Sequence, residues 1–216
     1  FLGSSCIYPK HANQPITEES LLKNELESTN EPYAIAKIAG LKLCESLRLQ
    51  SQFDAISLMP TNLYGPNDNY HPENSHVMPA LIKKFLDAES NNISTVTCWG
   101  TGSALREFLY VDDLAEAAIF CLEKWDPSAK DAPQDKFGNL LNHLNVGSGK
   151  DISIKELATK IAKITNYKGE ILWDKSKPDG TPRKLLNIEK ITKLGWKPKI
   201  SLNDGIKKTI KSFNLN

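Results

Sequence analysis

The sequence lacks two patterns that would place it among metal-stabilised, secreted or membrane proteins. Its four cysteines, Cys6, Cys44, Cys98 and Cys121, form no Cys-x-x-Cys pair and have no histidine pair nearby, so neither a zinc site nor a disulfide framework is indicated. No metal site is therefore expected, and a reducing cytoplasm is the expected location. There is also no apolar run of membrane-spanning length and no signal-peptide pattern, so no membrane association is expected.

An excess of charge of one sign is absent as well. The chain has 27 Lys and Arg residues against 26 Asp and Glu residues. This balance gives no electrostatic reason to expect nucleic acid or an anionic membrane as a partner, so any bound anion must be held by local groups. Hydrophobic residues make up 40% of the 216 residues, which is enough for a core in one domain or in two small ones.

No Gly-x-Gly-x-x-Gly or Gly-x-x-Gly-x-x-Gly motif occurs in the chain. A dinucleotide site of the usual kind needs such a turn between a strand and a helix N-terminus, where backbone amides and the helix dipole meet the pyrophosphate. The groups that would hold most of a dinucleotide are therefore not expected within these residues.

The chain does contain a Tyr33-x-x-x-Lys37 pair in a predicted helix. That spacing puts both side chains on one helix face, and a cation beside a phenol favours proton transfer at neutral pH. A serine in the Gly-Ser-Ser-Cys turn at 3–6 can bond the same substrate oxygen; Ser4 is the expected serine and Ser5 its rival. Such a group gives or takes a proton while a hydride moves. The alternative is a surface helix pair without chemistry.

The elements around this pair alternate between strand and helix, which favours an α/β fold. The helix predicted over 32–51 carries apolar residues at Ile35, Ala39, Leu43 and Leu47, which predicts that this face packs on a sheet. The polar segment 60–76 is a candidate binding loop. Further strands are predicted at 94–99, 108–111, 144–146 and 171–173. Further helices are predicted at 77–88 and from an Asp112 N-cap to Lys124. Another helix begins with a Ser153–Glu156 capping box, and two helices close the chain, the last of them capped by Ser201.

Six strings carry a family resemblance over essentially the whole chain. They are GSSCIYP (3–9), NEPYAIAKIAG (30–40), LMPTNLYGPNDNYHPENSHVMPAL (58–81), REFLYVDDLA (106–115), NVGSG (145–149) and SKPDGTPRK (176–184). With them the chain resembles the GDP-L-fucose synthases of the extended short-chain dehydrogenase/reductase superfamily. The resemblance implies an α/β fold, the C-terminal part of an NAD(P)-binding Rossmann fold with a smaller α+β substrate-binding lobe. The Rossmann portion is expected at 1–62, with 106–147 partly returning to it, and the lobe at 63–105 and 148–216.

The family activity is the NADPH-dependent 3,5-epimerisation and 4-keto reduction of GDP-4-keto-6-deoxy-D-mannose to GDP-L-fucose. By resemblance, Ser4 holds the ketone oxygen, Tyr33 protonates the 4-oxygen, and Lys37 assists Tyr33 and bonds the nicotinamide ribose. Epimerisation needs acid/base groups on both faces of the sugar, and Cys6 and His76 match those roles, with base and acid left open between them. Alternatively, Cys6 is a small buried core residue and His76 is a surface histidine without a catalytic role.

The resemblance also implies the binding residues and a homodimer for the full-length protein. The expected NADP(H) contacts come from Ser4, Tyr33, Lys37, Pro60, Thr61, Asn62, Leu63 and His76. The expected GDP-sugar contacts are phosphate binding by Lys84 and Arg106, stacking on Trp99, and hydrogen bonds to Asp179. The structural alternatives are a solvated lysine, an ion-paired arginine, a core tryptophan and a turn aspartate.

Two other functions stay open. A sugar-nucleotide 4-epimerase or dehydratase of the same superfamily shares the Ser, Tyr and Lys but does not require the Cys6 and His76 pair. A non-catalytic nucleotide-sugar-binding module would explain the missing Gly-rich motif. Because the family carries that motif in an N-terminal segment absent here, the sequence is expected to be the C-terminal two-thirds of such an enzyme and inactive by itself.

Overall fold

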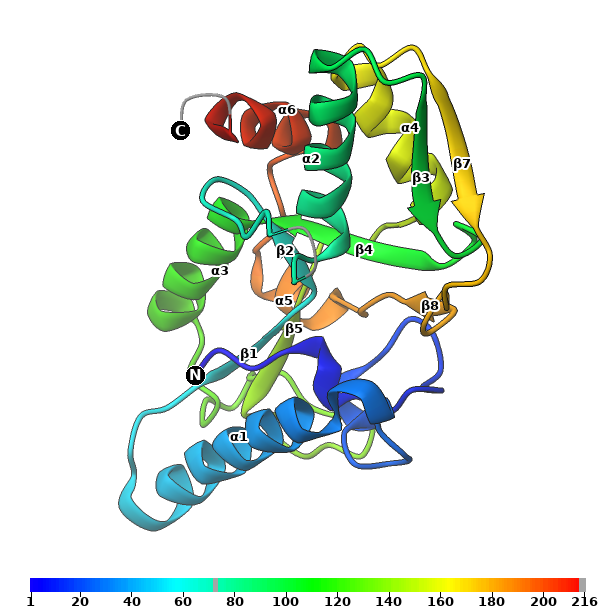
Figure 1. The fold of residues 1–216 in the computed structure, drawn as a ribbon. Helices are drawn as coiled ribbons and strands as arrows, with labels where there is room; N and C mark the ends of the chain where they lie inside the picture. The colour runs from blue at the N-terminus through cyan, green and yellow to red at the C-terminus, as the bar shows by residue number, and fades with distance from the viewer. Residues whose placement is uncertain (72–73, 214–216) are drawn as a thin grey trace. The chain divides into compact units, whose positions relative to one another are not determined.

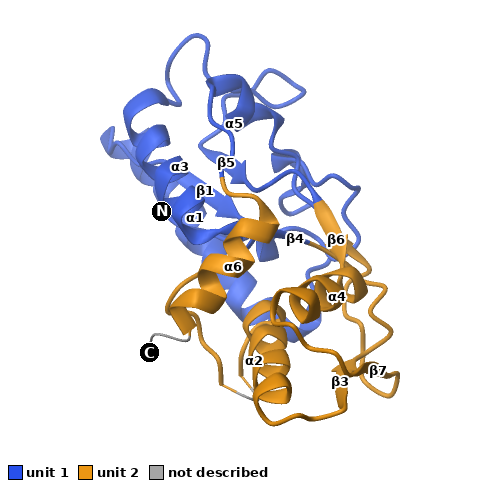
Figure 2. Cartoon of the chain, turned by 90° about the horizontal axis from the view of Figure 1, so that it is seen from above, with its two compact units in different colours: residues 1–63, 107–150, 184–199 blue, residues 64–106, 151–183, 200–216 orange. Residues whose placement is uncertain are grey.

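The computed structural model describes residues 1–71 and 74–213, which form two compact units (Figures 1 and 2). Unit 1 contains 1–63, 107–150 and 184–199, and unit 2 contains 64–106, 151–183 and 200–216. The chain therefore passes between the units at 63–64, 106–107, 150–151, 183–184 and 199–200. Within the described ranges, no helix is long and apolar enough to cross a membrane.

The centre of unit 1 is a parallel pair of strands, β1 (Ser57–Pro60) and β5 (His143–Val146), in which Leu58 lies opposite Leu144. Leu2 adds a parallel bridge to Leu58, and the Gly3 backbone N–H donates to the Leu58 carbonyl at 2.9 Å. Every residue of both strands is buried. Such continuous burial is typical of parallel strands covered on both faces.

The helices of unit 1 are α1 (Glu31–Ser51), α3 (Val111–Lys124) and α5 (Glu189–Leu194) (Figure 1). Three short 3₁₀ helices precede α1 in the chain: η1 (Ser5–Ile7), η2 (Glu18–Ser20) and η3 (Ser28–Asn30). One hydrophobic core joins β1, β5, α3 and α5, and a second joins η1, α1 and the segment that follows residue 184.

The α1 helix lies where the sequence predicted it, but the predicted buried face is wrong. Ala34 and Leu41 are fully buried and Ile38 packs against the same core, whereas Ile35 is 53% exposed and Leu43 is 59% exposed. Apolar residues occur on more than one side of this helix, and the predicted four-residue repeat follows only one of two apolar stripes. The stripe that packs is the other one, which contains Ala34, Ile38 and Leu41.

The segment 184–199 belongs to unit 1, whereas the predicted division placed it in the smaller lobe. Ile16 explains this position, because its backbone N–H donates to the Leu185 carbonyl at 2.8 Å and its carbonyl accepts from Asn187 at 2.8 Å. Leu186, 2% exposed, then completes the second core. These contacts join parts of the chain far apart in sequence, so no local pattern announced them.

Unit 2 is built on a second parallel pair, β3 (Thr95–Trp99) and β7 (Glu170–Asp174), with the helices α2 (Val77–Ser90), α4 (Ile154–Ile164) and α6 (Leu202–Phe213). The predicted capping box is confirmed, because Ser153 Oγ accepts from the Glu156 N–H at 3.1 Å and Glu156 Oε2 accepts from the Ser153 N–H at 3.1 Å. The predicted Ser201 cap is also confirmed by a 3.2 Å bond from the Asp204 N–H.

Four strands lie at four of the five points where the chain changes units. The strands are β2 (Asn62–Tyr64), β4 (Leu105–Tyr110), β6 (Asp151–Ser153) and β8 (Arg183–Lys184). The predicted Asp112 cap is wrong, because β4 runs directly into α3 and Tyr110 is the N-cap residue without a side-chain bond. Asp112 therefore lies in the first helical turn, where its charge is favourable near the helix N-terminus.

Candidate functional site

The Ser4–Cys6 segment forms a turn directly after the strand-like start of the chain. Ser4 is the N-cap of η1, and its Oγ accepts from the Cys6 N–H at 3.2 Å. Ser5 is 3% exposed, so Ser4 is the more accessible of the two serines. Ile7 and Tyr8 are buried immediately afterwards. The turn therefore presents Ser4 and Cys6 from an anchored backbone.

Tyr33 and Lys37 lie in the first turns of α1, which packs against η1. Lys37 Nζ is 5.7 Å from the centroid of the Tyr33 ring and donates a 2.9 Å hydrogen bond to the Leu2 carbonyl. Tyr33 is 50% exposed, so part of this residue is accessible from solvent. The four-residue spacing thus brings a cation to the phenol, as the helix geometry predicts.

The Cys6 sulfur has two nitrogen neighbours. Asn30 Nδ2 and Lys184 Nζ each donate to Cys6 Sγ at 3.4 Å. Sequence reasoning assigned no role to either residue, although Asn30 begins one of the six family-like strings and Lys184 ends another. No pattern along the chain links Lys184 to Cys6, because 178 residues separate them.

The segment 60–63, which the resemblance places beneath a nicotinamide, is held by Glu107. Thr61 Oγ1 and Asn62 Nδ2 both donate to the Glu107 carbonyl, at 3.3 Å and 2.8 Å. The Glu107 carboxylate is fully buried and accepts from the Gly149 N–H at 2.6 Å and the Leu186 N–H at 2.9 Å. Burial raises the pKa of this carboxyl, while the two backbone donors oppose the change.

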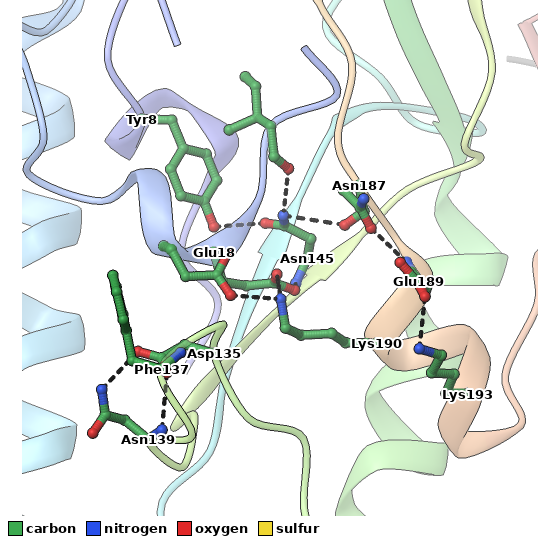
Figure 3. A network of polar contacts seen from close by, with 12 residues as sticks. Tyr8, Glu18, Asp135, Phe137, Asn139, Asn145, Asn187, Glu189, Lys190 and Lys193 are labelled. Atoms are coloured by element: carbon green, nitrogen blue, oxygen red, sulfur yellow. Dashed lines mark hydrogen bonds and ion pairs between the residues drawn. The ribbon is translucent and has the colours of Figure 1, made fainter. Parts of the chain in front are cut away.

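A second buried network centres on Asn145, in β5 (Figure 3). Asn145 Oδ1 accepts from the Tyr8 hydroxyl at 2.6 Å, and its Nδ2 donates to the carbonyls of Ile16 and Asn187 at 2.9 Å and 3.2 Å. Burial, reinforced by the charge of Glu18, raises the pKa of Tyr8, so the phenol stays protonated and donates. One asparagine thereby ties η1 and the segment after residue 184 to the central strand.

In unit 2, Trp99 and two lysines form an exposed cationic and aromatic surface. Trp99 is 61% exposed, so the core alternative for this residue is excluded. Lys84 Nζ lies 5.6 Å and Lys177 Nζ 5.5 Å from the Trp99 ring centroid, and Lys84 also donates to the Thr97 carbonyl at 3.0 Å. Lys177 was not singled out from the sequence.

Arg106 and Asp179 lie together in the same unit. Arg106 Nη2 donates to the Asp179 carbonyl at 3.4 Å, and burial lowers the pKa of Arg106. Both Asp179 carboxylate oxygens accept from Thr101, one from the backbone N–H and one from Oγ1, each at 2.7 Å, and these bonds lower the pKa of Asp179. Asp179 therefore stabilises the turn at 100–102, and its contact with a base or ribose stays a prediction.

His76 belongs to unit 2, where it is the exposed N-cap residue of α2 without a side-chain capping bond. The structure thus gathers Ser4, Cys6, Tyr33 and Lys37 in unit 1, and Lys84, Trp99, Arg106 and Asp179 in unit 2. Across the described ranges, no group of three His, Cys, Asp or Glu side chains could hold a metal ion.

A serine turn directly after a segment bridged to a parallel sheet, with a Tyr-x-x-x-Lys helix packed against that turn, is typical of the short-chain dehydrogenase/reductase class. The chain belongs to the NAD dependent epimerase/dehydratase family, whose model matches residues 1–147. The fold is α/β and Rossmann-like, which confirms the predicted fold class.

Two curated relatives and one solved structure show how close the similarities are. The chain is 56% identical over 216 residues to "Probable GDP-L-fucose synthase 1" of Oryza sativa subsp. japonica, covering 100% of this chain and 62% of the relative. It is 54% identical to GDP-L-fucose synthase of Escherichia coli (strain K12), covering 100% of this chain and 66% of the relative. A GDP-mannoheptose C4 reductase from Campylobacter jejuni with NADP bound matches at TM-score 0.86 and 37% identity, covering 99% of this chain and 67% of that one.

These matches confirm the family resemblance that the six strings predicted. The chain spans less than two thirds of the length of the curated Oryza relative, namely 62%. The activity, substrate and partners of the whole protein are therefore proposed below.

Proposed function

We propose that the protein that carries this chain is an NADP(H)-dependent GDP-L-fucose synthase. It epimerises GDP-4-keto-6-deoxy-D-mannose at C3 and C5 and reduces its 4-keto group to give GDP-L-fucose. The observation that carries the proposal is the 54–56% identity over all 216 residues to two proteins named for that activity. The Cys6 and Tyr33 groups described above supply the proton chemistry that such a reaction needs.

The reduction step uses the Ser4, Tyr33 and Lys37 group. Ser4 Oγ hydrogen-bonds the 4-keto oxygen, and the Tyr33 hydroxyl gives that oxygen a proton as the carbonyl becomes an alcohol. The Lys37 ammonium, held beside the Tyr33 ring and on the Leu2 carbonyl, stabilises the phenolate that Tyr33 leaves behind.

The epimerisation step uses Cys6 and His76 as the acid/base pair on opposite faces of the sugar. Removal of a carbon-bound proton beside the ketone sends its electron pair into the carbonyl, which becomes an enolate hydrogen-bonded by Ser4. Return of a proton from the opposite face inverts the carbon. Either residue can be the base, provided that the other is the acid.

The residues of unit 1 fit a nicotinamide cofactor. We assign the Lys37 ammonium to a ribose hydroxyl and the segment 60–63 to the nicotinamide, with the Thr61 and Asn62 side chains bonded to the Glu107 carbonyl. Ser4 and His76 complete the proposed contacts. When bound, the nicotinamide supplies the hydride. NADP is the proposed form because the similar Campylobacter reductase binds it.

The residues of unit 2 suit the nucleotide diphosphate of the substrate. Lys84 and Arg106 offer positive charge to phosphate, Trp99 offers an exposed ring to the base, and Asp179 retains free lone pairs for hydroxyl or amino groups. We propose further that the protein is a cytoplasmic homodimer. Free cysteines at all four positions support a reducing compartment, and exposed apolar residues on α1 support self-association.

Isotope exchange tests this function in the protein that carries the chain. The keto substrate in deuterated water should take up deuterium at both C3 and C5, and Cys6→Ser should abolish this uptake. Tyr33→Phe should slow NADPH oxidation by roughly a hundredfold or more, because general acid catalysis contributes about that much, yet leave exchange largely intact. Loss of both activities in Tyr33→Phe would refute the division of roles.

A second candidate function is reduction at C4 without epimerisation, which the likeness to the Campylobacter C4 reductase favours. The same experiment separates the two, since a pure reductase oxidises NADPH without taking deuterium into C3 or C5. A competition titration with GDP-, UDP- and dTDP-sugars tests the choice of base: GDP-sugars should compete best. Equal competition by all three would contradict the guanine assignment.

A further inference from the structure

We infer that Lys184 stabilises the thiolate form of Cys6 during proton transfer at the sugar carbon, and that Asn30 fixes the direction of the sulfur. This role rests on the proposed epimerisation and adds two residues to it. Lys184 acts through Cys6, with which it shares unit 1.

The first support is the number of donors at the sulfur. Asn30 Nδ2 and Lys184 Nζ both donate to Cys6 Sγ at 3.4 Å. A neutral thiol is a weak acceptor, whereas a thiolate accepts strongly and is the reactive form of cysteine. A thiolate at this position can accept from both converging N–H donors.

The second support is the charge balance around Lys184. Among the residues that the structure describes, no carboxylate pairs with its ammonium, whereas Lys190 in the same unit pairs with Glu18 and Glu19, both at 2.9 Å. Lys184 is half-buried, so its charge is only partly hydrated. A thiolate at Cys6, 3.4 Å from Lys184 Nζ, supplies the missing counter-charge.

The third support is that both partners are held by the backbone. The Leu185 N–H donates to Gln14 Oε1 and the Leu186 N–H to Glu107 Oε2, each at 2.9 Å, so the chain after Lys184 is anchored twice. On the other side, the Asn145 network anchors η1 through Tyr8. The contact of Lys184 with Cys6 is therefore built into the fold of unit 1.

Asn30 also indicates that this cluster faces a ligand. Its Oδ1 is buried and has no hydrogen-bond partner among the described residues, while its Nδ2 is on Cys6. Buried acceptors are nearly always satisfied, so an O–H donor from outside the chain is expected here. A hydroxyl of the sugar beside the reacting carbon is the chemistry that fits.

The proton balance is the same in both directions. When Cys6 is the base, the C–H bond breaks, an S–H bond forms, and the electron pair moves into the keto group as an enolate. When Cys6 is the acid, the S–H bond breaks and the proton goes to carbon. Lys184 keeps its protons throughout and stabilises the anionic sulfur at the start of one direction and the end of the other.

Alkylation of Cys6 tests the pairing without requiring catalysis. Neutral iodoacetamide and anionic iodoacetate are reacted at pH 7 with wild-type protein and with the Lys184→Met, Lys184→Gln and Lys184→Arg variants. Modification of the Cys6 and Cys44 peptides is followed by mass spectrometry. Lys193→Met is the matched control, because Lys193 is 73% exposed in its side chain and pairs with Glu189 on α5.

We expect Lys184→Met and Lys184→Gln to slow Cys6 alkylation about tenfold, with a larger loss for iodoacetate than for iodoacetamide. Lys184→Arg should retain most of the rate, while Lys193→Met and the Cys44 rate should not change. A changed Cys44 alkylation rate in Lys184→Met would show that this variant is misfolded. The Cys6 rate in Lys184→Gln then tests the inference. Wild-type Cys6 rates in both neutral variants, or equal slowing in Lys184→Arg, would overturn the inference.

The exchange assay distinguishes failure of this inference from failure of the proposed function. If wild-type protein takes up no deuterium at C3 and C5, the function fails whatever the alkylation rates are. If wild-type protein exchanges and Lys184→Met exchanges equally fast, the function stands and Lys184 has no role in it. Deuterium exchange that is slowed in Lys184→Met and restored in Lys184→Arg supports both the proposed function and the role of Lys184.

Discussion

At the scale of single residues, the least expected group in unit 1 is a pair of buried polar side chains without partners. His143 and Ser57 lie opposite each other in the β1–β5 register. Both ring nitrogens of His143 and the Ser57 Oγ are buried and lack hydrogen-bond partners among the described residues. Burial lowers the pKa of His143 to about 4, with Glu45 opposing the change.

This histidine should make the stability of the protein depend on acidity. An unfolded chain takes up a proton on a histidine below about pH 6.5, whereas folded His143 does so only near its pKa of about 4. The free energy of unfolding should therefore fall as pH drops from about 6.5 to 4, by about 3 kcal/mol. His143→Leu should remove this part of the slope in urea titrations at pH 7 and pH 4. A stability difference between variant and wild type that is the same at both pH values would contradict the assignment.

Residue types at regular spacing were predictable, and contacts between distant residues were not. Tyr33 and Lys37 could be found because a helix brings residues four apart together. Lys184 could not be placed beside Cys6, since 178 residues separate them. Glu107 and Asn145 were missed for the same reason, because a buried polar residue is recognised by its partners and not by its neighbours in sequence.

At the scale of elements, local signals were reliable and the choice of buried face was not. The capping box at Ser153 and Glu156 was correctly predicted because its four participating groups lie within four residues. The Asp112 cap failed because β4 extends to Tyr110, and a strand's length depends on its partners. The buried face of α1 failed because the helix is apolar on more than one side.

The exposed stripe of α1 leads to a prediction about assembly. Ile35, Leu43 and Leu49 are 53%, 59% and 83% exposed, and exposed apolar patches mark interaction sites. A second copy of the chain can cover such a stripe through a two-fold contact. Leu43→Glu should convert the proposed dimer to monomer in size-exclusion chromatography with light scattering. Leu172→Glu, at a leucine 41% exposed on β7, is the control and should not; a dimeric Leu43→Glu protein would place the interface elsewhere.

At the scale of the whole molecule, the division into units follows contacts and not chain order. The predicted division placed 148–216 in one lobe, because composition along the chain shows no break there. In the structure, 184–199 returns to unit 1 through Ile16 and Leu186, and it brings Lys184 with it. A residue that we place at the candidate site therefore comes from the segment that sequence reasoning assigned to the other unit.

The five passages between units should also make unfolding cooperative. If unit 2 unfolded alone, its segments 64–106 and 151–183 would be loops closed at both ends by folded parts of unit 1, which reduces the entropy they could gain. Partial unfolding is therefore disfavoured relative to complete unfolding. In the 216-residue chain, a Trp99→Phe, Trp173→Phe double variant leaves Trp125 and Trp196, 5% and 4% exposed in unit 1, as the fluorescent reporters. In urea, their fluorescence midpoint should coincide with the circular dichroism midpoint, which reports the helices of both units. Two separated midpoints would show that the units unfold independently, and that the repeated passages of the chain do not couple them.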